Sequence, residues 1–189
     1  ELLGYTEEDT VVIPVPFFHC FGMVIGVIAT VSHGSLAVIP ARSFEPVSAL
    51  RAVAATGATS LYGVPAMFIA MLARPEADEL DLTTLRTGVM AGSTCPVEVM
   101  KKVIDRFHMS EVAIAYGMTE TSPVSCQTRV DDDLERAEHV LPVGRTGGGH
   151  RVGDDRTHPG AFRRTDDGGG RLLEHLLVPP LKRAIPFAQ

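Results

Sequence analysis

The stretch Val112-Ala113-Ile114-Ala115-Tyr116-Gly117-Met118-Thr119-Glu120-Thr121 joins a short apolar run to a polar turn. The apolar run predicts a buried strand, and the turn begins where that strand ends. In open α/β sheets, ligands bind at the carboxyl ends of the strands. A ring, a hydroxyl and a carboxylate emerge here together, and they suit a base, a phosphate and Mg²⁺. The residue types alone favour the simpler interpretation, an ordinary polar turn after a strand.

Upstream of this stretch, short β-branched runs alternate with longer segments of helical pattern. The alternation predicts an α/β fold with a largely parallel sheet and helices on both faces. The expected strands are residues 11–15, 36–39, 59–62, 85–91 and 112–115. The expected helices are residues 17–31, 46–56, 65–73 and 96–107, with a charged loop over 74–81.

Local signals predict where two of these helices begin and end. Pro46 suits the first turn of its helix, and Gly57 is placed to end it. Thr94 or Cys95 is expected to cap the helix at 96–107, and Glu98 would interact favourably with the helix dipole.

The composition indicates a globular chain that does not bind nucleic acid. Its 189 residues are 45% hydrophobic and carry a net charge of −6, without a basic stripe to neutralise phosphates. The three cysteines, Cys20, Cys95 and Cys126, lie far apart and form no C-x-x-C pair. Neither a disulfide framework nor a zinc site is indicated, and a reducing cytoplasm fits best.

The apolar stretch at residues 11–31 is not expected to span a membrane, because Pro, His and Gly residues interrupt it. A buried strand followed by a core helix, apolar all round, is the expected structure. The first residues show no Met start and no signal-peptide pattern, which favours a fragment of a longer chain.

Two further stretches could carry chemistry. In Pro16-Phe17-Phe18-His19-Cys20-Phe21-Gly22, the histidine could line a pocket or be a satisfied core residue, and Cys20 is expected to be buried as a small hydrophobe. Ala91-Gly92-Ser93-Thr94 follows a strand and opens a helix, so its backbone N–H groups could bind an anion or a flat polar ring. The same four residues could form only a tight turn, since they match neither G-x-G-x-x-G nor G-x-S-x-G.

The character of the chain changes after Gly144. Residues 144–170 hold nine of the 18 glycines and few apolar side chains, so this region is expected to be disordered. No strand precedes the Gly147-Gly148-Gly149 run and no GK[ST] follows it, which argues against a phosphate loop. A nicotinamide-dependent oxidoreductase is disfavoured, because no glycine fingerprint follows the first strand.

Four stretches, in this order and at these separations, resemble the AMP-forming adenylating enzymes, which include acyl-CoA synthetases, luciferases and peptide-synthetase adenylation domains. They are residues 16–22, Gly63-Val64-Pro65, Asp81-Leu82-Thr83-Thr84-Leu85-Arg86 and Tyr116-Gly117-Met118-Thr119-Glu120-Thr121-Ser122-Pro123-Val124. The last is most similar to fatty-acyl-CoA synthetases. The resemblance implies that residues 1–143 are part of a large N-terminal adenylation domain and that residues 144–189 are a Gly/Arg-rich tail.

The resemblance implies a nucleotide site with Mg²⁺. Tyr116 would stack on adenine, Thr119 would bond phosphate oxygens, and Glu120 would hold the metal ion. The residues that would contact ATP or AMP are Gly92, Ser93, Thr94, Tyr116, Gly117, Met118 and Thr119.

The resemblance also implies an acyl pocket and a reaction. His19, Phe21 and Val64 would line the pocket for the acyl carboxylate, and His19, Thr119 and Glu120 are the catalytic candidates. A carboxylic acid, expected to be a fatty acid, would attack the α-phosphate of ATP to give acyl-AMP and pyrophosphate, and CoA would then form the thioester. The CoA site is not expected within this chain.

Departures from the family pattern lower the expectation of activity. The family's phosphate loop with its Lys, its ribose-binding Thr-Gly-Asp and its C-terminal catalytic Lys are not recognised in this sequence. The tail resembles GC-rich coding sequence read in a shifted frame. We therefore expect no turnover from this polypeptide alone, and a non-catalytic remnant that binds an acyl-nucleotide or a protein partner is the alternative.

Overall fold

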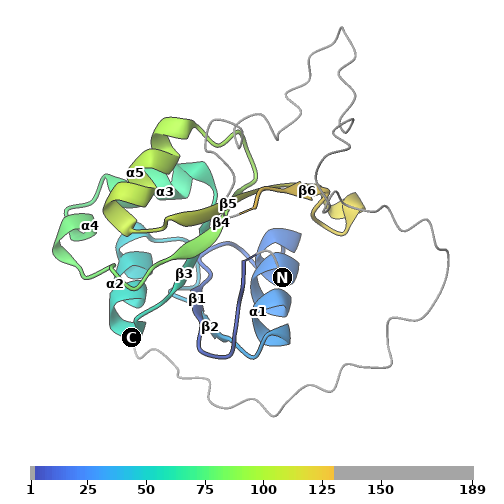
Figure 1. Cartoon of the computed structure of the whole chain (residues 1–189), viewed down its shortest axis with the longest axis horizontal. Helices are drawn as coiled ribbons and strands as arrows, with labels where there is room; N and C mark the ends of the chain where they lie inside the picture. Colours follow the sequence, from blue (N-terminus) through green and yellow to red (C-terminus); the bar gives the residue numbers. More distant parts are fainter. Residues whose placement is uncertain (1–2, 130–189) are drawn as a thin grey trace, which may run out of the picture. The chain divides into compact units, whose positions relative to one another are not determined.

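In the computed structural model, which describes residues 3–129, six strands form one sheet in the order β2-β1-β3-β4-β5-β6 (Figure 1). The strands are β1 (Thr10–Val12), β2 (Leu36–Val38), β3 (Ser60–Gly63), β4 (Thr87–Ala91), β5 (Glu111–Tyr116) and β6 (Cys126–Gln127). Neighbouring strands pair in parallel except β5 and β6, which are antiparallel. The predicted α/β fold with a largely parallel sheet is confirmed, and β6 is a strand that the sequence analysis missed.

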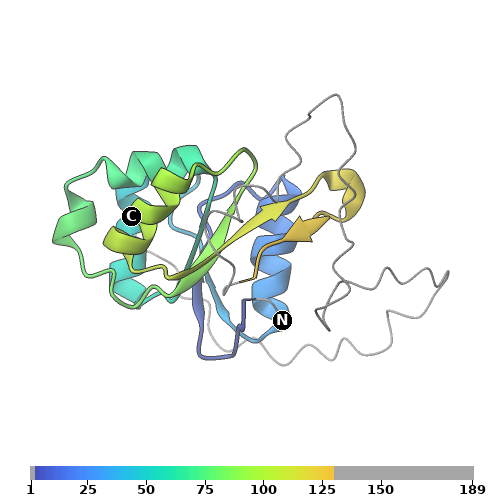
Figure 2. The same ribbon diagram turned by 45° about the horizontal axis from the view of Figure 1, so that its top comes forward.

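Helices cover both faces of the sheet, as predicted (Figures 1 and 2). The helical segments are η1 (Phe21–Ile28), α1 (Ala29–Ser32), α2 (Pro46–Thr56), α3 (Pro65–Leu72), α4 (Glu76–Glu79), α5 (Val97–Phe107) and the single 3₁₀ turn η2 (Thr119–Thr121). β2 and β3 lie on opposite sides of β1 in the sheet, so the chain reverses its direction across the sheet after β2. Right-handed crossovers in opposite directions place η1 and α1 on one face and α2 to α5 on the other.

Two apolar clusters lie on opposite faces of the sheet, because successive strand residues point to alternate sides. Val12, Leu61 and Met90 belong to the cluster with α2, α3 and α5. The other cluster contains Tyr62, whose ring stacks on Phe21 of η1 with centroids 5.9 Å apart. Each face of the sheet therefore packs against helices through its own apolar cluster.

The helix predicted at residues 17–31 is wrong in its start and in its character. It begins at Phe21, is wound as a π-helix to Ile28, and continues as α1 to Ser32. Its outer face is open, with Met23 42% and Ile28 53% exposed, so it is not a core helix. Its buried residues are Phe21, Gly22 and Gly26, and a Cβ at Gly22 would collide with the Pro16 carbonyl group.

Helix ends were predicted with mixed success. Pro46 opens α2 and Gly57 ends it in the left-handed region, as expected. The cap predicted at Thr94 or Cys95 is wrong, because Pro96 holds that position and no side chain caps α5. The Cys95 thiol instead points inward and donates to the Met90 carbonyl.

The remaining predictions concern shorter segments and the tail. The charged segment at residues 74–81, expected to be a loop, contains the short helix α4. The domain boundary at residue 143 and the disorder predicted for residues 144–189 lie outside the described residues. Within residues 3–129, none of the helices has the length and apolar character needed to cross a bilayer.

Candidate active site at the carboxyl edge of the sheet

Three neighbouring strands end together at the carboxyl edge of the sheet. Gly63 of β3 is in register with Met90 of β4, and Ala91 of β4 with Ala115 of β5. The residues that follow these strands are therefore brought to one edge although they are far apart in sequence. This is the edge at which parallel sheets bind ligands.

A pocket with an empty space of about 330 Å³, its open mouth included, lies at this edge. Segments from the start of η1, the end of β4 and the turn after β5 form its walls. Its lining residues are His19, Cys20, Phe21, Ile25, Ala91, Gly92, Ala115, Tyr116, Gly117, Pro123 and Val124. The lining is mostly apolar with a few polar groups, as is usual for small-molecule sites.

The pocket brings together five of the residues proposed from sequence, which are His19, Phe21, Gly92, Tyr116 and Gly117. Tyr116 is half-buried and ends β5, so its ring is available at the pocket wall. Phe21 lines the pocket, is buried, and stacks its ring on that of Tyr62. The roles of these residues remain predictions.

The other proposed residues lie outside the pocket lining. Val64 stands behind the turn at Gly92, since a Cβ on that glycine would be 3.0 Å from the Val64 Cγ1 atom. Gly92 has φ of +92°, a conformation that favours glycine. The exposed residues are Ser93, Thr94, Met118, Thr119 and Glu120.

The turn after β5 folds the chain back on itself. A Cβ on Gly117 would collide with the Pro123 carbonyl group, so the backbone at the start of the turn lies directly against the backbone at its end. The Ser125 N–H donates to the Tyr116 carbonyl at 2.9 Å and begins the pairing with β6. This return brings Pro123 and Val124 to the pocket, a contribution that the sequence analysis did not identify.

His19 is held in one tautomer by the backbone. Its Nδ1 atom accepts a hydrogen bond from the Phe21 N–H at 3.0 Å, so the ring proton of the neutral form is on Nε2. The ring is exposed at the pocket and is not a satisfied core histidine. His19 can therefore donate one hydrogen bond from Nε2.

Cys20 was predicted to be buried, and this is wrong. It is half-exposed, lines the pocket, and places its Sγ atom 3.8 Å from the His19 Nδ1 atom and 3.6 Å from the Thr119 Oγ1 atom. The prediction failed because Cys20 precedes the first turn of η1, where the chain faces the η2 turn and not the sheet. Cys95 is the buried cysteine, and desolvation raises the pKa of its thiol to about 12.

The carboxylate predicted to hold Mg²⁺ lies on η2, outside the pocket lining. In the part of the chain that the structure describes, no group of three His, Cys, Asp or Glu side chains could hold a metal alone. Glu120 offers one exposed carboxylate at η2. Mg²⁺ commonly takes one or two carboxylates and fills its other positions with water and substrate phosphates, so one carboxylate is sufficient.

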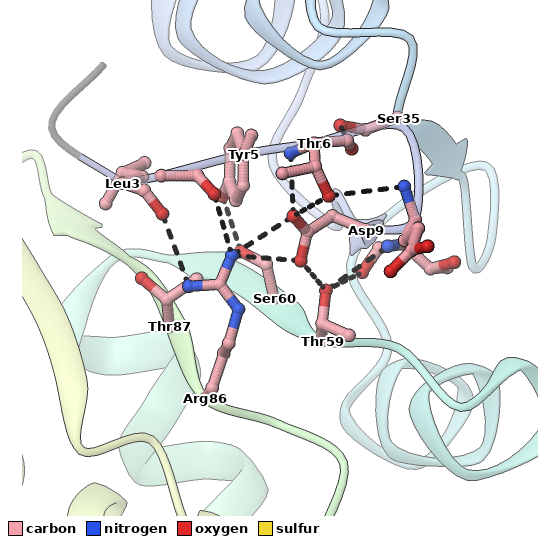
Figure 3. Close-up of polar contacts among 12 residues, drawn as sticks. Leu3, Tyr5, Thr6, Asp9, Ser35, Thr59, Ser60, Arg86 and Thr87 are labelled. Carbon is pink, nitrogen blue, oxygen red and sulfur yellow. Dashed lines mark hydrogen bonds and ion pairs between the residues drawn. The ribbon is translucent and has the colours of Figure 1, made fainter.

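The opposite, amino-terminal edge of the sheet holds an ion-pair network (Figure 3). The Arg86 guanidinium donates to both Asp9 carboxylate oxygens at 3.0 and 3.1 Å and to Glu111 Oε2 at 2.8 Å. It also reaches the Leu3 carbonyl at 3.3 Å. Asp9 further accepts from the Thr59 hydroxyl at 2.6 Å.

Each member of this network stands at the start of a strand. Asp9, Thr59 and Arg86 directly precede β1, β3 and β4, and Glu111 is the first residue of β5. The network therefore joins four strands at one point. Burial by itself would raise the pKa of Asp9, but hydrogen bonds from Thr59, the Thr6 amide and Arg86 lower it below its usual value overall.

Comparisons with known proteins agree with this architecture. The model of the AMP-binding enzyme family matches residues 1–157. The putative acyl-CoA synthetase YngI of Bacillus subtilis is 55% identical over 136 residues, which are 72% of this chain and 25% of that protein. The mitochondrial medium-chain acyl-CoA ligase ACSF2 of Rattus norvegicus is 39% identical over 130 residues, which are 69% of this chain and 21% of that protein.

The fold is shared with ATP-bound MatB from Rhodopseudomonas palustris, with a TM-score of 0.61 at 22% identity over 70% of this chain and 25% of that one. Together with the family match, these likenesses show that the chain belongs to the AMP-binding enzyme family. It spans about a quarter of the length of the curated relatives described above.

Proposed function

We propose that this chain is part of an ATP-dependent, AMP-forming ligase that activates a carboxylic acid, a fatty acid in our proposal, for thioester formation with CoA. The observation that carries the proposal is the pocket in which His19, Gly92 and Tyr116 meet from three separate segments. Family membership supports the reaction class, since relatives with 55% and 39% identity are named as a putative acyl-CoA synthetase and a medium-chain acyl-CoA ligase.

The nucleotide would lie along the turns after β4 and β5. Tyr116 would stack on adenine, while the backbone of residues 92–94 and of Gly117 and Met118 would border the base. Small side chains at the turn after β4 permit close approach of a flat ring. Thr119, the first residue of η2, would donate its hydroxyl proton to phosphate oxygens.

Glu120 would hold Mg²⁺ beside the phosphates, where the ion would neutralise negative charge. The reacting carboxylate and the triphosphate are both anions, so donor placement should dominate catalysis. The Nε2 hydrogen of His19 is a donor in the pocket that could orient the carboxylate. Phe21, with Val64 behind the Gly92 turn, would provide the apolar surface for the acyl chain.

In the reaction, a carboxylate oxygen would attack the α-phosphorus while the bond to the β-phosphate oxygen breaks. Acyl-AMP and pyrophosphate are the products, and no proton transfer is needed in this step. The CoA thiol would then displace AMP to give the thioester. We keep the expectation that the 189-residue chain alone does not turn over, because recognisable phosphate-loop and catalytic-lysine motifs are not found in its sequence.

Two measurements on the 189-residue chain test the proposal. Isothermal titration calorimetry should detect binding of MgATP and tighter binding of a non-reactive acyl-sulfamoyl adenosine, which resembles acyl-AMP. ATP–pyrophosphate exchange with a panel of short-, medium- and long-chain fatty acids should show no activity. If the chain binds neither MgATP nor the acyl-sulfamoyl adenosine, the proposed site is wrong. Robust ATP–pyrophosphate exchange would overturn only the expected inactivity. Binding without exchange also describes the non-catalytic alternative, in which the site holds an acyl-nucleotide without reacting.

A further inference from the structure

The contact between Cys20 and Thr119 joins two segments that are 99 positions apart in sequence. Cys20 immediately precedes η1, and Thr119 is the first residue of η2. Their Sγ and Oγ1 atoms are 3.6 Å apart, within hydrogen-bond range for sulfur. Within residues 3–129, the thiol is the only hydrogen-bond partner of the Thr119 hydroxyl.

The orientation of the thiol follows from its two neighbours. His19 Nδ1 already accepts from the Phe21 N–H at 3.0 Å, and it is farther from the Cys20 sulfur than the Thr119 hydroxyl is. The nearer polar neighbour of the thiol is therefore the Thr119 hydroxyl on η2. The thiol lies between a candidate acyl-pocket residue and a candidate phosphate ligand.

We propose that Cys20 is a positioning residue, which orients the Thr119 hydroxyl and ties the η2 turn to the start of η1. The inference rests on the proposed function, because it assigns Thr119 to the phosphates. Thr119 is exposed on a three-residue turn, where its hydroxyl could otherwise sample several staggered rotamers. A contact from the facing segment reduces that freedom before the nucleotide arrives, which favours binding.

The first test needs no ligand. Hydrogen exchange of the Thr121 and Ser122 amides, which donate to the Met118 and Thr119 carbonyls, reports the order of the η2 turn. Replacing Cys20→Ala should speed this exchange about two- to fivefold, as expected for loss of a weak hydrogen bond. Cys20→Ser, which keeps a hydroxyl, should restore part of the protection. Cys126→Ala, which removes a thiol outside the pocket lining, is the control and should leave the rates unchanged.

The second test separates positioning from general damage. Cys20→Ala should weaken MgATP binding about two- to fivefold and leave adenosine binding unchanged, because only the phosphates need Thr119. In a Thr119→Val background, Cys20→Ala should have no further effect on MgATP binding.

Unchanged amide exchange in Cys20→Ala would overturn the inference. So would an equal loss of adenosine and MgATP binding in that variant. The inference would also fail if the effects of Cys20→Ala and Thr119→Val on MgATP binding were additive in the double variant. If the unmodified chain binds neither nucleotide, the proposed function fails. The exchange rates still decide whether the contact orders the turn.

Discussion

The two edges of the sheet are built from different chemistry. At the amino-terminal edge, Arg86 joins Asp9 and Glu111 through contacts of 2.8 to 3.1 Å, and four strand starts are tied together. At the carboxyl edge, short turns surround a mostly apolar pocket, and several of the candidate side chains are exposed. The same strands therefore carry stability at one end and candidate binding groups at the other.

The largest expected effect is at the ion-pair network. Arg86→Met should lower the free energy of unfolding by about 2–3 kcal/mol, because it leaves the buried Asp9 carboxylate without its cation. The loss should be below that of a fully buried pair, since the Arg86 side chain is 35% exposed. Urea unfolding followed by circular dichroism measures it.

Lys101→Met is the matched control for Arg86→Met. It removes an exposed ion pair with Glu98 and should cost less than about 0.5 kcal/mol. MgATP binding at the opposite edge should be unchanged in Arg86→Met under native conditions. If binding were lost while stability stayed constant, the separation between the two edges would be wrong.

The same network predicts a dependence of stability on pH. The pKa of Asp9 is lower in the folded chain than its ordinary value of 3.8. Its contribution should therefore be complete above about pH 4 and be lost as pH falls through the folded-state pKa, because protonation breaks the pair with Arg86. In Asp9→Asn, this part of the acid dependence should be absent from urea unfolding measured as a function of pH. An acid profile identical to that of the unmodified chain would contradict the assignment to Asp9.

At the carboxyl edge, Tyr116→Ala should affect binding more than stability. Loss of base stacking is expected to weaken MgATP binding about tenfold, which corresponds to roughly 1.4 kcal/mol. Tyr116→Phe keeps the ring and should bind normally. Titration calorimetry on both variants, with urea unfolding alongside, makes the comparison. Equal weakening by the Phe and Ala variants would assign the effect to the hydroxyl group and not to stacking.

The smallest effect is expected at Ser93. Its side chain is exposed and outside the pocket lining, so Ser93→Ala should change stability by less than about 0.5 kcal/mol and MgATP binding by less than about twofold. Gly92→Ala, at the neighbouring position, should have a larger effect than Ser93→Ala. The φ of +92° at Gly92 and the nearby Val64 side chain leave little room for a Cβ. A large effect of Ser93→Ala would show that this turn acts through a side chain and not through its backbone.

Features encoded by local sequence were predicted well. The apolar run before Tyr116 identified β5, and Pro46 and Gly57 marked the ends of α2. These signals depend on backbone preferences of a few adjacent residues, which act in the same way in most folds. The placement of Gly92 and Tyr116 at the ends of strands was also predicted, from the apolar runs that precede them.

Features that depend on distant contacts were missed. Arg86 and Asp9 are 77 positions apart in the sequence. Each is a charged residue next to an expected strand, and neither position indicates that the other is its partner. The exposure of Cys20 reflects its position before η1, where its thiol contacts Thr119, 99 positions away in the sequence. The two-residue strand β6 is too short to give a periodic pattern and exists because the chain turns back at Gly117.

The amino-acid sequence alone determined an α/β sheet whose fifth strand ends in a turn after Tyr116, because hydrophobic periodicity and turn residues act over short distances. Two sets of contacts required the folded chain. One joins Cys20 to His19 and Thr119, and the other is the ion-pair network around Arg86. Side chains far apart in sequence find one another only after the strands have paired and set their register.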